Sequence, residues 1–255
     1  MRLVIITQNA PVYLPTFLDQ FLKKVVSKHN IVNFVVLSSK HKRTFFQVFR
    51  ERADYYGAVG FVQMSLYILY QKALSLFLYS RNKYSVKQVL KKYSLNLLQI
   101  SSINSQEFIR YIKEKEIELV VSIASPTIFK GELLQAPAKG CINYHTGLLP
   151  KYRGRQPLFW ALLNDEEEFG ITVHFMNHNI DDGPIISQKK ITIDHQDSLH
   201  NLYCKNIEQG PDVLVDSLEK IDNEPCKNES TQATYYSFPK KQDSHKFRKK
   251  GKTFF

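Results

Sequence analysis

Short apolar runs constrain the fold of this chain more than any other feature. Each run has the length of a strand and is too short for a helix, and the clearest ones cover residues 3–7, 31–37, 119–123 and 140–144. Nearly continuous apolar strands are typical of parallel sheets, because helices cover both faces of such a sheet. Between the runs lie segments with helical apolar spacing, as at residues 15–27. We therefore expect an α/β fold with a Rossmann-like, mostly parallel sheet and helices on both faces.

The same signals predict the elements of the rest of the chain. Further strands are expected at residues 97–101, 170–176 and 185–193, and helices at 105–115, 128–134, 156–163 and 198–218. No Gly-x-Gly-x-x-Gly follows the first strand, so a dinucleotide site of the Rossmann type is not expected at that turn.

A helical insertion is expected at about residues 41–93, and its residues 58–79 are unusually apolar. Their length alone would allow a membrane span. Gln71 and Lys72 near the middle argue against one, because polar and charged side chains are costly inside a bilayer. We expect this helix to pack against protein, on its own subunit or in a homodimer. An interfacial helix that makes a peripheral membrane contact is the alternative.

Polar side chains collect at the ends of two predicted strands. Asn143 and His145 are two residues apart, a spacing that puts both on the same face of a strand. The strand at 170–176 leads to Asp181, so an amide, an imidazole and a carboxylate can meet beyond the strand ends, where ligands of open α/β sheets bind. This set suits acyl transfer, with the amide for a developing oxyanion and the other two groups for protons.

Each of these residues also has an ordinary structural explanation. Asn143 can bond to nearby backbone, His145 can be a buried core histidine, and residues 181–183 can form a plain turn. His174 and His178 suggest zinc, but four residues of strand span about 13 Å. That distance is too long for one ion with ligand bonds of about 2 Å. We therefore expect no metal site and place His174 in the core or at its rim.

The motifs around these residues occur in a fixed order. They read Asn143-Tyr-His145-Thr-Gly147-Leu-Leu-Pro150, Arg153-Gly154, Gly170-Ile-Thr172 and Asp181-Asp-Gly183. Over residues 119–193 the chain thereby resembles the folate-dependent formyltransferases, whose signature is Asn-x-His-x-Ser-Leu-Leu-Pro, Arg-Gly or Lys-Gly, Gly-Val-Thr and Asp-x-Gly. One departure stands out, since Gly147 stands where the family usually has Ser. Several spaced motifs in the right order carry far more weight than any one of them.

The resemblance implies an N-formyltransferase that uses 10-formyltetrahydrofolate as co-substrate and a primary amine as acceptor. It implies that Asn143 and a protonated His145 stabilise the oxyanion, and that Asp181 orients His145 and helps to move the amine proton. It also places the catalytic domain at about residues 1–220, followed by a small C-terminal appendage with a basic tail at 221–255.

Binding residues follow from the same resemblance. The pterin is expected to lie against two loops that comprise Ser125, Pro126, Thr127, Ile128, Phe129, Asn179 and Asp181. Lys151, Arg153 and Arg155 lie where an anionic substrate would bind, so they are candidate phosphate ligands. A solvated loop is the alternative explanation for these three cations.

The acceptor is less constrained than the reaction. Relatives that act on glycinamide ribonucleotide usually have a Gly-Ser-Asn loop after the first strand, where this chain has residues 7–11, TQNAP. Relatives that act on initiator methionyl-tRNA usually carry a C-terminal β-barrel, and 37 residues of this 255-residue chain follow Leu218. We favour a nucleotide-linked amino sugar as acceptor. Initiator methionyl-tRNA, or another small or lipid-linked amine, is the alternative.

Composition bears on partners and compartment. Residues 240–252 carry seven Lys or Arg and one Asp, and thus six of the formal net charge of +11. Nucleic acid binding is not expected, because this tail lacks an RGG pattern and has few interleaved aromatic residues. A folate or nucleotide sensor is the non-enzyme alternative, although it would not need all three catalytic groups. The three cysteines form no Cys-x-x-Cys pair, which indicates a cytoplasmic protein, membrane-associated if residues 58–79 lie on a bilayer.

Overall fold

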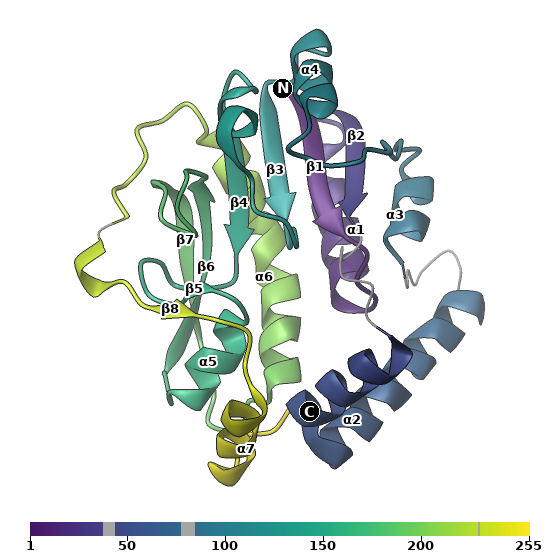
Figure 1. Cartoon of the computed structure of the whole chain (residues 1–255), viewed down its shortest axis with the longest axis vertical. Coiled ribbons are helices and arrows are strands. Elements are labelled where there is room, and N and C mark those ends of the chain that lie inside the picture. The colour runs from purple at the N-terminus through teal and green to yellow at the C-terminus, as the bar shows by residue number, and fades with distance from the viewer. Residues whose placement is uncertain (38–43, 78–84, 229) are drawn as a thin grey trace.

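A six-stranded sheet forms the centre of the computed structural model, which describes residues 1–37, 44–77, 85–228 and 230–255 (Figure 1). Its strands are β1 (Arg2–Gln8), β2 (Asn30–Leu37), β3 (Leu119–Ile123), β4 (Cys141–His145), β6 (Glu168–Phe175) and β7 (Ile185–Thr192). They lie in the order β2-β1-β3-β4-β6-β7. The first four pair in parallel, whereas β6 and β7 are antiparallel to their neighbours. The predicted mostly parallel α/β sheet is therefore confirmed.

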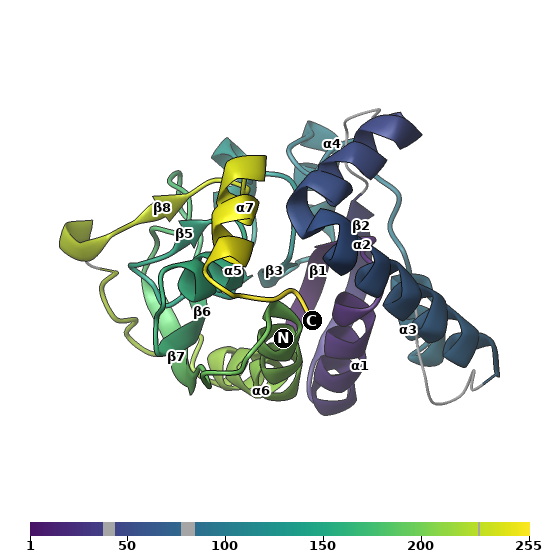
Figure 2. The same cartoon turned by 90° about the horizontal axis from the view of Figure 1, so that it is seen from below.

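Helices cover both faces of this sheet (Figure 2). Helices α1 (Tyr13–Val25) and α6 (Leu199–Glu219) pack side by side on one face. Helix α4 (Gln106–Glu114) and the 3₁₀ turn η1 (Gly131–Gln135) cover the other. The alternation of side chains along each strand divides the core in the same way.

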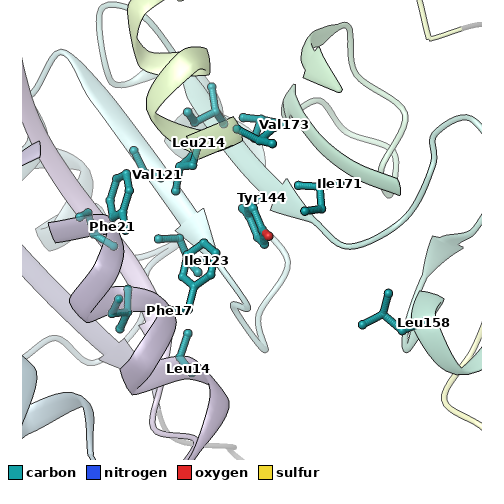
Figure 3. Close-up of a cluster of buried hydrophobic side chains, with 14 of the residues drawn as sticks. Leu14, Phe17, Phe21, Val121, Ile123, Tyr144, Leu158, Ile171, Val173 and Leu214 are labelled. Atoms are coloured by element: carbon teal, nitrogen blue, oxygen red, sulfur yellow. The ribbon is translucent and has the colours of Figure 1, made fainter. Parts of the chain in front are cut away.

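Figure 3 shows part of the core on the face that α1 and α6 cover. Val121 and Tyr144 point toward α1 and α6 and belong to one buried cluster with Leu214. Val120 and Cys141 belong to the other cluster, under α4, and each directly precedes a residue of the first cluster in the sequence. On β4, the same alternation places two polar side chains, Asn143 and His145, on the α4 face at the carboxyl end of the strand.

Serine caps fix where several helices begin. Ser85 and Ser198 each form a capping box at the start of α3 (Val86–Lys92) and α6. Ser105 accepts a backbone N–H at the start of α4. Each cap satisfies an N–H group that has no partner inside the helix, which typically stabilises a helix by about 1 kcal/mol.

The insertion contains the long helix α2 (Phe45–Phe77), which is bent at Gly57. Gly57 has φ 70° and ψ 173°, a conformation that favours glycine, so the glycine at this position accounts for the bend. The predicted helical insertion is confirmed for α2 and α3, while residues 41–43, 78–79 and 80–84 of the predicted range lie outside the described residues. Within the described ranges, none of the helices combines the length and the apolar character that crossing a bilayer requires.

The C-terminal segment returns to the main body of the protein. Strand β8 (Tyr235–Tyr236) pairs in parallel with β5 (Arg153–Gly154), and helix α7 (Lys241–Lys249) contacts α2 and α5 (Pro157–Leu163). A further 3₁₀ turn, η2, spans Ser230–Gln232. Phe247 and Phe254, at 0% and 5% exposure, join the main hydrophobic core.

One predicted element is wrong and another is shorter than predicted. Residues 97–101 do not form a strand, since only Leu97 makes an isolated bridge, to Phe34 of β2. Their apolar side chains mark burial but do not complete a hydrogen-bond ladder with the sheet. The short helix predicted at 128–134 is present as the 3₁₀ helix η1, which begins only at Gly131.

Candidate active site

Strands β4 and β6 bring four polar side chains to one face of the sheet. Asn143 and His145 lie on β4, with buried Tyr144 between them on the opposite face. Because β6 runs antiparallel to β4, His174 lies opposite Asn143 and Thr172 lies opposite His145. Residues directly opposite each other in an antiparallel pair share a face. The sheet itself therefore aligns the amide with two imidazoles.

Asp181 reaches this group from the loop after β6. Its Oδ1 accepts from Asn143 Nδ2 at 3.2 Å and lies 3.5 Å from His174 Nε2. Its Oδ2 accepts the Gly154 backbone N–H at 2.8 Å and lies 3.5 Å from His145 Nδ1. The structure thus brings Asn143, His145 and Asp181 together, as the sequence predicts.

The surroundings keep Asp181 ionised. Its side chain is 11% exposed, and burial by itself raises the pKa of a carboxyl group. The neighbouring His145 and His174 and the Gly154 N–H outweigh that effect and hold the pKa of Asp181 well below its usual range. Asp181 is therefore a carboxylate at neutral pH, and its charge can orient an imidazole and stabilise the protonated form of that ring.

His145 is held at both ring nitrogens. Nε2 lies 2.9 Å from the backbone oxygen of Tyr152, and because that oxygen only accepts, Nε2 carries a proton. Nδ1 faces Asp181. For His145 to donate to an oxyanion, as expected, its ring must therefore break the hydrogen bond to Tyr152 O. Asn143 Nδ2 can donate to an oxyanion by giving up its contact with Asp181 or His174.

Gly147, the departure from the family signature, lies against this ring. A Cβ built there would be 2.5 Å from His145 Nε2 and 2.9 Å from the Tyr152 oxygen. Thr172 fixes the same loop, since its hydroxyl donates to Gly147 O at 2.6 Å and accepts from Leu149 N at 3.3 Å. The observed position of His145 is therefore compatible with glycine and not with the usual Ser.

The three predicted phosphate ligands have different surroundings. Lys151 and Arg155 are exposed, and the Arg155 guanidinium lies 5.0 Å from the centre of the Phe238 ring. Arg153 is 11% exposed and forms an ion pair with Asp182, Nη1 to Oδ1, at 2.5 Å. The charge of Arg153 is thus already compensated inside the protein, and Lys151 and Arg155 are the cations open to solvent.

The two predicted folate loops flank the strand ends. Ser125 follows β3 and holds its loop by bonds to Thr127, and Ile128 is 55% exposed while Phe129 is buried in the core under α4. In the other loop Asn179 donates to Asp182. Pro126 and Asn179 are exposed, one in each loop, and the placement of the folate ring against these loops remains a proposal.

Asn228, from the C-terminal segment, also contacts the Asp181 loop. Its Nδ2 donates to the backbone oxygens of Asp181 and Gly183, both at 3.1 Å. Its Oδ1 lies 3.4 Å from Nη2 of Arg153, which in turn pairs with Asp182. Asp181 has φ 50°, an unusual conformation for a non-glycine residue, so these bonds hold a strained loop in place.

We expect Asn228→Ala to lower kcat/KM for the reaction proposed below by about ten- to a hundredfold, because a small misplacement of Asp181 is enough for such a loss. The free energy of unfolding should fall by about 1–2 kcal/mol. Steady-state kinetics and urea denaturation measure the two effects. Asn223→Ala, an exposed amide in the same segment, is the matched control. Equal kinetics for the two variants would contradict this role.

Sequence reasoning placed His174 in the core or at its rim and did not assign it to the site. It is 2% exposed, its Nδ1 donates to Phe175 O at 2.7 Å, and its Nε2 faces Asp181 and Asn143. The antiparallel pairing of β6 with β4 is the signal that would have found it. No comparable signal marks Asn228. Among the described residues, no three His, Cys, Asp or Glu side chains are arranged to hold a metal ion.

Comparison with known proteins defines the class. The formyl transferase family model matches residues 32–218, and the chain belongs to that family. A relative from Caldanaerobacter subterraneus subsp. tengcongensis, a methionyl-tRNA formyltransferase, is 35% identical over 164 residues, which are 63% of this chain and 53% of the relative. The chain thus spans about half the length of the curated relatives it matches.

Solved structures with the same fold include sugar N-formyltransferases. One, from Shewanella sp FDAARGOS_354, is 22% identical with a TM-score of 0.60, covering 93% of this chain and 77% of that chain. Another is the N-formyltransferase from Helicobacter canadensis in complex with folinic acid and dTDP-3-aminofucose. It is 18% identical with a TM-score of 0.56, and covers 95% of this chain and 72% of that chain. At these identities the likeness establishes the fold.

Proposed function

We propose that this protein transfers a formyl group from 10-formyltetrahydrofolate to a primary amine. The observation that carries the proposal is the convergence of Asn143, His145 and Asp181 at the carboxyl end of β4, in a chain of the formyl transferase family. The co-substrate supplies an activated formyl group on nitrogen. The chain supplies a fixed amide donor and a buried carboxylate, which are the groups that acyl transfer to an amine requires.

Each residue has a distinct part in this proposal. Asn143 Nδ2 donates to the formyl oxygen, where negative charge develops. As the amine nitrogen bonds to the formyl carbon and the bond from that carbon to the folate nitrogen breaks, the proton that the amine loses passes through His145 to the departing nitrogen. Asp181 orients the His145 ring and stabilises its charged form. The loops around Ser125 and Asn179 would hold the folate ring, with the catalytic domain at about residues 1–220 and the segment 221–255 completing it through Asn228.

For the acceptor we favour a nucleotide-linked amino sugar. Support comes from the structural relative in complex with dTDP-3-aminofucose and from the exposed Lys151 and Arg155 beside the site, which can bind phosphate. Initiator methionyl-tRNA is the second candidate, because the curated relatives at 35% identity are methionyl-tRNA formyltransferases.

A competition assay tests both levels of the proposal. The protein is given 10-formyltetrahydrofolate with a set of amino-sugar nucleotides and with charged initiator tRNA, and mass spectrometry detects the added formyl group. We expect formylated sugar nucleotide. Formylation of the tRNA with no sugar product would refute the sugar and keep the transfer reaction. No formylation of any amine by an enzyme shown to be folded would refute the transfer reaction itself.

A further inference from the structure

The second half of helix α2 presents an apolar stripe to solvent. Its side chains follow helical spacing and are highly exposed: Val59 73%, Val62 55%, Leu66 60%, Leu69 61% and Tyr70 59%. Single exposed apolar residues are ordinary on protein surfaces, but a row of five along one helix is a contiguous patch. Such a patch requires an explanation.

The opposite face of this helix is already occupied by the protein itself. Gly60 packs against Phe254, and the ring of Tyr67 lies 6.3 Å from that of Tyr13 and 5.8 Å from that of Phe255, centre to centre. For residues 58–77, the part of the predicted helix 58–79 that the structure describes, packing against the same subunit therefore holds on the inner face only. The stripe is the part of the α2 surface that the protein itself does not cover.

Helix α7 adds positive charge beside the stripe. It contacts α2 at the bend, where the Arg248 side chain lies against Gly57 and its Nη1 donates to Tyr55 O at 3.3 Å. Lys246 and Lys249 of α7 are exposed. Helices α2 and α7 lie at the same end of the molecule (Figure 1). The segment 240–252 carries seven Lys or Arg and one Asp. Lys241 pairs with Asp54, and Lys250 and Lys252 pair with Asp165. The exposed Lys246 and Lys249 remain available to an anionic partner.

We propose that the α2 stripe and α7 together form a docking surface for an anionic lipid membrane. The stripe enters the boundary between headgroups and acyl chains, and the lysines of α7 bind the anionic headgroups, a combination typical of interfacial helices. A second copy of the chain fits less well, because it would bring an equally basic end, on a molecule of net charge +11, to the same surface.

The docking surface lies at the end of the molecule toward which the parallel strands run. The arrowheads of β1, β3 and β4 point toward the end of the molecule where α2 and α7 lie (Figure 1). His145 is the last residue of β4, so the candidate site also faces this end. Docking would therefore hold the reaction close to the membrane surface without any helix crossing it.

Flotation of the full chain with vesicles tests the proposal. Vesicles of phosphatidylcholine with phosphatidylglycerol are compared with phosphatidylcholine alone, at low and high salt. We expect binding to the anionic vesicles that weakens as salt rises, as headgroup binding requires. Leu66→Glu with Leu69→Glu should weaken it at least about tenfold, since insertion of the stripe supplies the apolar part of the affinity. Circular dichroism and thermal unfolding establish that the variant is folded.

Charge is tested separately. Lys246→Gln with Lys249→Gln should reduce binding, whereas Lys113→Gln with Lys115→Gln, which removes the same charge from the α4 end, should not. Absence of vesicle binding by the wild type, or equal loss for both pairs of lysines, overturns the proposal. So does a wild-type dimer in analytical ultracentrifugation that dissociates when Leu66 and Leu69 become Glu, because the stripe would then belong to a subunit interface.

Discussion

Asp181→Asn is expected to lower kcat/KM for formyl transfer by about 10²–10⁴-fold, the range for loss of a general acid–base group or of the carboxylate that orients it. The amide keeps the size of the carboxylate but removes its charge. Asn143, His145, His174 and the Gly154 N–H all face this carboxylate within 3.5 Å, so Asn would leave the two imidazoles without their common anionic partner. Steady-state kinetics with saturating co-substrate measure the effect.

Asp182→Asn is the neighbouring control. Asp182 pairs with Arg153 and accepts from Asn179, and it makes none of the contacts to Asn143 or His145. It should therefore lower kcat/KM by no more than about tenfold, through the position of its loop. If Asp181→Asn retained full turnover, or if Asp182→Asn were the more damaging change, Asp181 would lose its place in the proposed mechanism.

The fold and the three central residues could be predicted because their signals are local. Apolar runs such as residues 119–123 identify buried strands without knowledge of the rest of the chain. The two-residue spacing of Asn143 and His145 fixes a shared face in any strand. The motif order then brings in Asp181. Each inference needs only neighbouring residues or a family signature, and each agrees with the structure at the level of geometry.

The rest of the site depends on contacts between distant segments, for which the sequence has no local signal. His174 enters because β6 pairs with β4, a register that is decided by tertiary structure. Asn228 is 47 residues from Asp181 and lies in a polar segment without periodicity. The strand predicted at 97–101 failed for a related reason, since apolar residues identify burial but not the pairing that completes a strand.

The second large effect is expected from Gly147→Ala, with a loss of about 10² in kcat/KM, because misplacement of a catalytic group by about 1 Å is enough for such a loss. The new Cβ would lie 2.5 Å from His145 Nε2 and 2.9 Å from Tyr152 O, so the ring must shift, which disturbs its contacts with Tyr152 O and Asp181. Serine carries the same Cβ and should behave alike. Gly60→Ala is the matched control, since its Cβ meets Phe254 at an ordinary 3.4 Å.

A double-mutant cycle identifies the cause of this loss. Overpacking should lower the free energy of unfolding of Gly147→Ala by about 1–3 kcal/mol. In a His145→Ala background the clash with the ring is absent, so adding Gly147→Ala should cost less, by a coupling energy of about 1–2 kcal/mol. Urea denaturation of the two single variants and the double variant measures this coupling. Additive effects would mean that the Tyr152 backbone, and not the His145 ring, excludes a side chain at Gly147. His145 would then be free of the constraint that distinguishes this chain from the family signature.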